Sequence, residues 1–197
     1  MLLALDPGLN SPGVALFVPN TPPEMLRYAT RMVIPAVFAE LSDGERWMRV
    51  GVEIARWAAA RGHVTTIVFE RPQWYQHGKS KGDPNQLAGI AGVAANVTGF
   101  LNSYHAVRVL SPTPAEWIGQ LPKTCPTCKG KAKKKCLDCH GSAWETPRGR
   151  RIRSRLSEAE IALVPDQNDA IDSVGLGLWA LGRLTPRTVY SNGRDGR

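Results

Sequence analysis

The strongest constraint on the fold is a short apolar segment near the N-terminus that runs directly into an acid. Residues 2–5 are Leu-Leu-Ala-Leu, Asp6 follows them, and Pro7-Gly8 ends the segment. A short apolar run closed by turn residues predicts a buried strand, so the acid lies where the core ends. Asp6 then either starts a turn, which Asp favours because its side chain bonds the nearby backbone, or does chemistry together with other acids.

The segments after Asp6 predict two more strands and a helix. Residues 13–18 are apolar, and residues 26–34 mix apolar, aromatic and β-branched side chains, which predicts an antiparallel meander with the first strand. Ser42 and Glu45 have the spacing of a capping box. Apolar side chains recur at helical spacing from there to Gly62, so we expect a helix over this segment.

The second half of the chain alternates strands and helices. Residues 64–69 predict a strand rich in β-branched side chains, and this strand also runs directly into an acid, Glu70. The remaining elements are expected as a helix over 83–103, a strand over 106–110, a short helix over 114–121, and helices over 148–164 and 166–182. This order predicts an α/β fold with a mixed five-stranded sheet flanked by helices. Short, right-handed connections place strand 64–69 beside the first strand, so Asp6 and Glu70 meet at one edge of the sheet.

Two further acids lie at the start of the last predicted helix. Asp169 and Asp172 are three positions apart, which places both side chains on one face of the first turn. Acids at a helix start can simply cap it and complement its dipole, and Asp166 is the expected cap. The face of Asp169 and Asp172 continues into Gly175 and Leu176, however, so we expect it to point inward. Buried acids need a partner, and since no basic residue lies nearby in the sequence, a divalent cation would provide it.

The composition of this acidic set indicates the kind of metal. Clustered carboxylates without His or Cys suit a hard cation such as Mg²⁺ or Mn²⁺. Two such ions about 4 Å apart can stabilise both the attacking and the leaving oxygen of an in-line phosphoryl displacement. Phosphodiester hydrolysis with two Mg²⁺ (or Mn²⁺) ions in each active site would fit these acids, and it also fits the basic segment described below.

The ordered set of motifs resembles the RuvC-like Holliday-junction resolvases, which belong to the RNase H-like superfamily. The motifs are Leu5-Asp6-Pro7-Gly8, Phe69-Glu70 and Asp169-Ala170-Ile171-Asp172. The resemblance covers residues 1–121 and 148–184, which it implies form an RNase H-like nuclease domain. It also implies a homodimer that cuts opposing strands of a four-way DNA junction, with helix 83–103 in the dimer contact. The catalytic and Mg²⁺-binding residues that it implies are Asp6, Glu70, Asp169 and Asp172.

All four cysteines of the chain lie in an insert over residues 122–147. They form two Cys-x-x-Cys pairs, Cys125 with Cys128 and Cys136 with Cys139. Two such pairs predict a closed, tetrahedral four-cysteine knuckle that holds one structural Zn²⁺; disulfides are the alternative. His140 adjoins the last cysteine and is a further candidate ligand.

The insert is where the chain departs from the family that it resembles. Bacterial RuvC enzymes generally lack such an insert. Zinc ribbons between the second and last acidic motifs do occur in the RuvC-like domains of transposon-associated and RNA-guided nucleases. The departure leaves the active-site assignment intact and makes the specificity for four-way junctions an open question.

The excess positive charge of the chain is concentrated around the insert. Residues 122–156 hold eleven basic and two acidic residues, whereas the whole chain carries a net charge of +8. Such a segment on a near-neutral body indicates a polyanion-binding element; a solvated basic surface is the alternative. The loop after Glu70 mixes aromatic and basic residues, and an aromatic that stacks on a base contributes about 1–3 kcal/mol. The candidate DNA-binding residues are Trp74, Tyr75, Lys79, Lys81, Lys131, Lys133, Lys134, Lys135, Arg148, Arg150 and Arg151.

The sequence leaves three functions open. The leading hypothesis is a Mg²⁺-dependent, structure-selective DNA endonuclease that resolves Holliday junctions by paired nicks. A RuvC-like nuclease that acts on other branched, flapped or single-stranded DNA is the nearest alternative. The third is a non-catalytic nucleic-acid-binding zinc protein on an RNase H-like scaffold, in which the acids only cap helices and form turns.

Two further features of the sequence bear on where in the cell the protein is found. No apolar run approaches the roughly 18 residues of a membrane span. The N-terminus lacks the basic region of a secretory signal. We therefore expect a cytoplasmic protein without a membrane partner, and residues 185–197 are expected to form a flexible polar tail.

Overall fold

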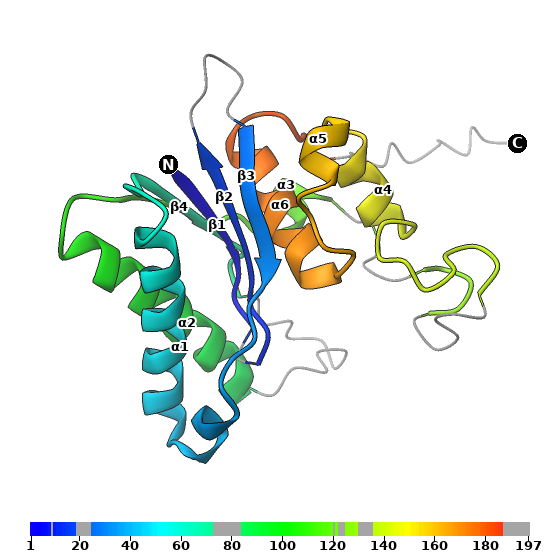
Figure 1. Ribbon diagram of the computed structural model, residues 1–197. Coiled ribbons are helices and arrows are strands. Elements are labelled where there is room, and N and C mark those ends of the chain that lie inside the picture. Colours follow the sequence, from blue (N-terminus) through cyan, green and yellow to red (C-terminus); the bar gives the residue numbers. More distant parts are fainter. Residues whose placement is uncertain are drawn as a thin grey trace, which may run out of the picture.

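A five-stranded mixed sheet in the order β3-β2-β1-β4-β5 lies at the centre of the computed structural model (Figure 1). The structure describes residues 1–8, 10–18, 25–72, 84–119, 121, 125–129 and 136–186. The strands are β1 (Leu2–Asp6), β2 (Gly13–Val18), β3 (Met25–Arg31), β4 (Thr66–Phe69) and β5 (Arg108–Leu110). The pairs β1–β2 and β2–β3 are antiparallel, whereas β1–β4 and β4–β5 are parallel. The sheet therefore confirms the expected RNase H-like topology.

Helices cover both faces of this sheet. They are α1 (Asp43–Ala59), α2 (Pro84–Asn102), α3 (Pro114–Trp117), α4 (Pro147–Arg153), α5 (Glu158–Ile161) and α6 (Asn168–Ala180), with a 3-10 helix η1 (Ala36–Glu40) before α1. Figure 1 shows α1 and α2 on one face of the sheet and α6 on the other, with α4 and α5 on the side of α6. None of the helices among the described residues combines the length and apolar character needed to cross a membrane.

The alternation of side chains along β1 determines toward which face of the sheet the Asp6 side chain points. Leu3 and Leu5 are buried in the core between the sheet and the α1–α2 layer. Leu2 and Ala4 are buried in the other core, between the sheet and α6. Because successive side chains of a strand point to opposite faces, Asp6 follows Leu2 and Ala4 toward α6.

The start of α1 is as the sequence predicts. Ser42 is the N-cap residue, and it forms a capping box with Glu45. The backbone N–H of Ser42 donates to Oε2 of Glu45 at 3.2 Å, and the Ser42 hydroxyl donates to the same oxygen at 2.5 Å. The hydroxyl and then the backbone N–H of Ser42 hold the pKa of Glu45 below its ordinary value, because both stabilise the charged carboxylate.

Several predicted elements have other bounds in the structure. The short helix expected over 114–121, for example, is α3 and ends at Trp117. The strand expected over 26–34 ends at Arg31. The helix expected over 148–164 is two short helices, because Ser154 is the C-cap of α4 and Ser157 starts α5 with its own capping box to Glu160. The serine and the glutamate three positions later are a start signal within the predicted helix, and this local signal outweighs the continuous helical pattern.

The predicted cap of the last helix is also wrong. Gln167 is the N-cap residue of α6, and its side chain makes no capping hydrogen bond. Asp166 instead accepts two long-range bonds at Oδ1, from the backbone N–H of Ala143 at 2.8 Å and of Trp144 at 3.2 Å. These donors belong to the segment that follows the cysteines, so Asp166 ties that segment to the start of α6.

Candidate active site and metal centre

Asp6 and Glu70 end neighbouring parallel strands. Leu5 of β1 is paired with Phe69 of β4, and each acid is the next residue along its chain. Both acidic side chains are half-buried. Since the carboxyl ends of parallel strands meet at one edge of a sheet, the structure places Asp6 and Glu70 where the sequence predicts them.

The start of α6 lies directly against this edge. Gly13 of β2 is paired with Asp6, and a Cβ atom added to Gly13 would lie 1.8 Å from the backbone oxygen of Asp169. Only glycine therefore lets the helix approach β2 so closely. Oδ2 of Asp169 accepts a hydrogen bond from the Ser11 hydroxyl at 3.3 Å and lies 3.7 Å from Nε of Arg31, which faces Gly13 from β3. These contacts hold Asp169 at the same edge as Asp6.

A buried indole holds Glu70. Nε1–H of Trp117, in α3, donates to Oε2 of Glu70 at 2.9 Å, and the Trp117 side chain is fully buried in the core beneath α6. Glu70 is therefore held on the face that α6 covers, which is also the face of Asp6. The sequence analysis missed Trp117, because no local pattern relates a tryptophan to an acid 47 residues away.

Asp172 is the most deeply buried of the four acids, and an arginine is its partner. Nη1 of Arg148, from α4, donates to Oδ2 of Asp172 at 3.2 Å, and the two side chains are 13% and 4% exposed. No basic residue lies near Asp172 in the sequence, but Arg148 reaches it in the folded chain, so this buried acid has a charged partner besides the expected divalent cation. The Arg148 guanidinium also lies over the Trp117 ring, 5.3 Å from its centroid. Glu70, Trp117, Arg148 and Asp172 thus form one continuous chain of contacts.

The acids share one edge of the sheet without forming a preassembled metal cage. Among the described residues, the four cysteines form the group whose ligand atoms lie close enough together for one ion, and the carboxylates form no such group. Carboxylate oxygens are nevertheless the ligands that Mg²⁺ prefers, so the donor set fits that ion. Arg31 and Arg148 are the cations that the structure places at Asp169 and Asp172.

The basic residues proposed to bind DNA differ in their surroundings. Arg150 is exposed, with Nη1 3.9 Å from a carboxylate oxygen of Glu145. Arg151 donates to the backbone oxygen of Thr185 at 3.4 Å, and Arg148 faces Asp172. The other proposed DNA-binding residues lie outside the described residues: Trp74, Tyr75, Lys79, Lys81, Lys131, Lys133, Lys134 and Lys135.

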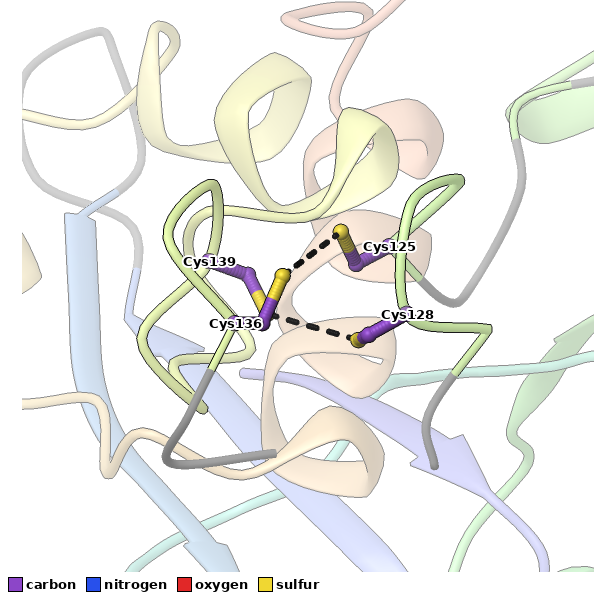
Figure 2. Close-up of side chains that lie close together, drawn as sticks. All are labelled: Cys125, Cys128, Cys136 and Cys139. Carbon is purple, nitrogen blue, oxygen red and sulfur yellow. Dashed lines mark hydrogen bonds between the residues drawn. The ribbon is translucent and has the colours of Figure 1, made fainter. Parts of the chain in front are cut away.

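The four cysteines converge on one point, as Figure 2 shows. Their sulfur atoms all lie within 4.8 Å of one another, with 3.8 Å between Cys125 and Cys136 and 3.7 Å between Cys128 and Cys139. A tetrahedral site with Zn–S bonds of about 2.3 Å places its sulfurs about 3.8 Å apart, whereas a disulfide needs about 2.0 Å. All four cysteines are free, so the geometry fits the predicted zinc site and not the disulfide alternative.

The two Cys-x-x-Cys turns have matching backbones. The residues that follow them, Lys129 and His140, both have a φ of 48°, and each donates its N–H to the carbonyl of the first cysteine of its pair at 2.8 Å. Backbone donors, the N–H of Cys128 first, lower the pKa of Cys125 to about 7, whereas burial and the neighbouring cysteines raise the pKa of Cys139 to about 12. A lowered pKa favours the thiolate, which is the form that binds a metal. The set of four sulfurs is complete without His140, whose side chain is exposed.

Comparison with known proteins identifies the fold. A scan against protein-family models finds no match, and no curated protein matches the sequence. Among solved structures, the chain is similar to Thermus thermophilus RuvC in complex with a Holliday junction substrate, with a TM-score of 0.51 and 12% identity over 94% of this chain and 98% of that chain. The chain has the fold of the RuvC-like resolvases. Ydc2, the yeast mitochondrial Holliday junction resolvase, is similar with a TM-score of 0.53 and 9% identity over 92% of this chain and 79% of that chain.

The candidate site is built from separate elements of this fold. The acidic edge is built from β1, β4 and the start of α6, and the cysteine insert lies between α3 and α4. Identities this low show the fold alone.

Proposed function

We propose that this protein is a Mg²⁺-dependent, structure-selective DNA endonuclease that resolves four-way junctions by paired nicks. The observation that carries the proposal is that Asp6, Glu70, Asp169 and Asp172 all lie on the face of the sheet that α6 covers. Its support includes the fold of the chain, since one similar protein is described in complex with a Holliday junction substrate and another as a Holliday junction resolvase.

The proposed chemistry divides the work between metal and protein. The carboxylates Asp6, Glu70, Asp169 and Asp172 would hold two Mg²⁺ (or Mn²⁺) ions. When bound, such ions stabilise the charge on a phosphodiester and activate the attacking water. The protein supplies the positions: Trp117 holds Glu70 through its indole N–H, and Gly13 lets the backbone of Asp169 lie beside Asp6.

The proposed partner is branched DNA bound by a homodimer. The basic residues in and after the cysteine insert would contact phosphates, except Arg148, whose guanidinium pairs with Asp172. The aromatic residues after Glu70 would stack on bases. Salt-dependent binding is expected, because each neutralised phosphate releases counterions. One structural zinc ion per chain would hold the insert together, since a knuckle this small has little core of its own.

A cleavage assay with three substrates tests the proposal. A synthetic four-way junction, a flap and a linear duplex are incubated with Mg²⁺ or with a chelator. We expect Mg²⁺-dependent paired nicks on the junction, and Asp6→Asn should lower the rate by about 10²-fold or more, as loss of a charge-stabilising group does elsewhere. Asp43→Asn, an exposed acid at the start of α1, is the matched control and should cut at the wild-type rate.

The same assay decides between the alternatives. Cutting of the flap or of single strands in preference to the junction would favour a RuvC-like nuclease with another branched substrate, which the cysteine insert makes the second candidate. DNA binding without a Mg²⁺-dependent product on any substrate would overturn the nuclease proposal and leave a non-catalytic zinc protein.

A further inference from the structure

We propose that Arg148 is a positioning residue through which the four-cysteine insert holds Asp172 in place. The inference rests on the proposed function, because it assigns Asp172 to the active site. It adds a coupling between the cysteine insert and α6, which the positions of the acids alone do not imply. The metal centre in the insert would control the geometry of the acidic site on α6.

Three groups hold the Arg148 guanidinium. Nη1 donates to Oδ2 of Asp172 at 3.2 Å, Nη2 donates to the backbone oxygen of Leu121 at 3.4 Å, and the carbon of the guanidinium lies 5.3 Å from the centroid of the Trp117 ring. The side chain is only 13% exposed. The planar guanidinium can donate from its edge in two fixed directions while its face lies over an aromatic ring, and the compact ammonium of lysine has no such rigid fork.

The segment from the last cysteine to Arg148 is short and tightly bonded. Ser142 donates its N–H to the carbonyl of Cys139 at 2.7 Å, and the next two N–H groups donate to Asp166 as described above. Thr146 then caps α4, since its hydroxyl oxygen accepts from the N–H of Gly149 at 3.0 Å and its hydroxyl donates to the carbonyl of Ala143 at 2.8 Å. A displacement of the second cysteine pair would therefore be passed along this segment to Arg148.

Gly149 packs the start of α4 directly against the segment that leaves the cysteine insert. A Cβ atom added at this position would lie 2.2 Å from the carbonyl oxygen of Ala143. The residue next to Arg148 thus packs directly on the backbone that leaves the cysteine insert. A movement of that backbone would therefore displace Arg148.

Arg148 also contacts the segment that enters the insert. Leu121, whose carbonyl it binds, precedes Cys125 by four positions. The two cysteine pairs close the loop between these segments, because Cys125 faces Cys136 across the cluster (Figure 2). A metal bound by the four sulfurs would fix both segments, and its loss would free both ends of the insert.

The coupling is measured by amide hydrogen exchange on the full chain, without DNA. The readout is the set of amides from Ile171 onward in α6, the first of which donates to the carbonyl of Gln167 at 3.0 Å. Removal of zinc with a chelator should speed this exchange about tenfold or more, since exchange reports local opening. Arg148→Met should speed the same exchange with zinc still bound. Chelation should speed exchange less in this variant than in the wild type, because the bonds of Asp166 to Ala143 and Trp144 are a second link between the insert and α6.

Two other variants test the role of charge and provide a matched control. Arg148→Lys keeps the charge and should behave like Arg148→Met. Arg153→Met removes an exposed arginine of the same helix, whose Nη1 lies 3.5 Å from a carboxylate oxygen of Glu145, and should exchange like the wild type. Independent, multiplying effects of chelation and Arg148→Met would overturn the proposal. Wild-type exchange in Arg148→Lys would overturn it too, because charge alone would then suffice.

Cleavage kinetics give a second readout that separates this inference from the proposed function. On a four-way junction, Arg148→Met should lower kcat while KM for the DNA stays within about twofold, because a misplaced acid impairs the chemical step and not DNA binding. An unchanged kcat would overturn the role of Arg148. A wild-type protein that cuts no DNA would remove the nuclease proposal, whereas the exchange experiment would still decide whether the insert and α6 are coupled through Arg148.

Discussion

At the scale of single residues, a second buried ion pair stabilises the layer around α6. Both guanidinium ends of Arg183 donate to Glu160, each at 2.8 Å, and the Glu160 side chain is only 4% exposed. Glu160 also accepts from the backbone N–H of Leu26 in β3 at 3.1 Å and of Ser157 at 3.0 Å. This one carboxylate therefore connects α5, β3 and the residues that follow α6.

Breaking this pair should be costly at neutral pH. Arg183→Met leaves the Glu160 carboxylate buried without its counter-ion, which costs about 3–5 kcal/mol of unfolding free energy. Arg56→Met is the control, because its partner Glu53 is 3.2 Å away on the surface and an exposed pair contributes about 0–1 kcal/mol. Denaturant unfolding measures both changes. Equal losses of unfolding free energy in the two variants would show that the buried pair contributes no more to stability than the exposed pair.

The same pair should make stability depend on pH. The Arg183 guanidinium lowers the pKa of Glu160 from its ordinary value of 4.5 to about 2. A carboxyl with a depressed pKa stabilises the fold above its ordinary pKa and loses that contribution as pH falls toward the folded value. The stability difference between wild type and Glu160→Gln should therefore shrink as the pH drops from about 4.5 to 2. A difference that stays constant over this range would contradict the assignment.

At the scale of secondary-structure elements, the sequence predicted what depends on local pattern and short connections. The strand before Asp6 and the strand before Glu70 follow from apolar runs, and their adjacency follows from right-handed connections. The sequence predicts a metal ion as the partner of Asp172, because no basic residue lies near it in the sequence. The partner that the structure shows, Arg148, comes from the far side of a helix break, and Trp117 comes from yet another element. Contacts of this kind depend on tertiary packing and leave no periodic signal in the chain.

The close approach of α6 to β2 gives a prediction about the element itself. Gly13→Ala should push α6 off the sheet, because the new Cβ would meet the backbone oxygen of Asp169 at 1.8 Å. Overpacking of this kind costs about 1–3 kcal/mol, and displacement of Asp169 should also abolish cleavage of the junction. Gly44→Ala is the matched control: it has no atom within 4 Å, so the same change should raise stability by about 0.4–1 kcal/mol. Thermal unfolding and the cleavage assay measure both effects, and wild-type activity in Gly13→Ala would contradict the account.

At the scale of the whole molecule, the two layers of helices have different roles. The acids and the cysteine insert lie on the α6 side of the sheet, whereas α1 and α2 bury its opposite face (Figure 1). Some small residues of α2 serve the α1–α2 packing, since a Cβ atom added at Gly92 would lie 3.0 Å from the Trp47 ring. Other small residues of α2 are exposed: Ala88, Ala91, Ala95 and Gly99. This second, exposed stripe is where the proposed homodimer would form its contact.

Substitution on this stripe tests the dimer. In a twofold-symmetric dimer, Ala95→Arg occurs on both sides of the interface, and juxtaposed like charges there cost several kcal/mol. We therefore expect sedimentation to show twice the chain mass for the wild type and a single chain for the variant, which should nick one strand of a junction instead of two opposing strands. Ala159→Arg, on the exposed surface of α5 in the other layer, should remain dimeric and make paired nicks. A wild type that sediments as a single chain at every concentration would reject the dimer, and a dimeric Ala95→Arg variant would move the contact away from α2.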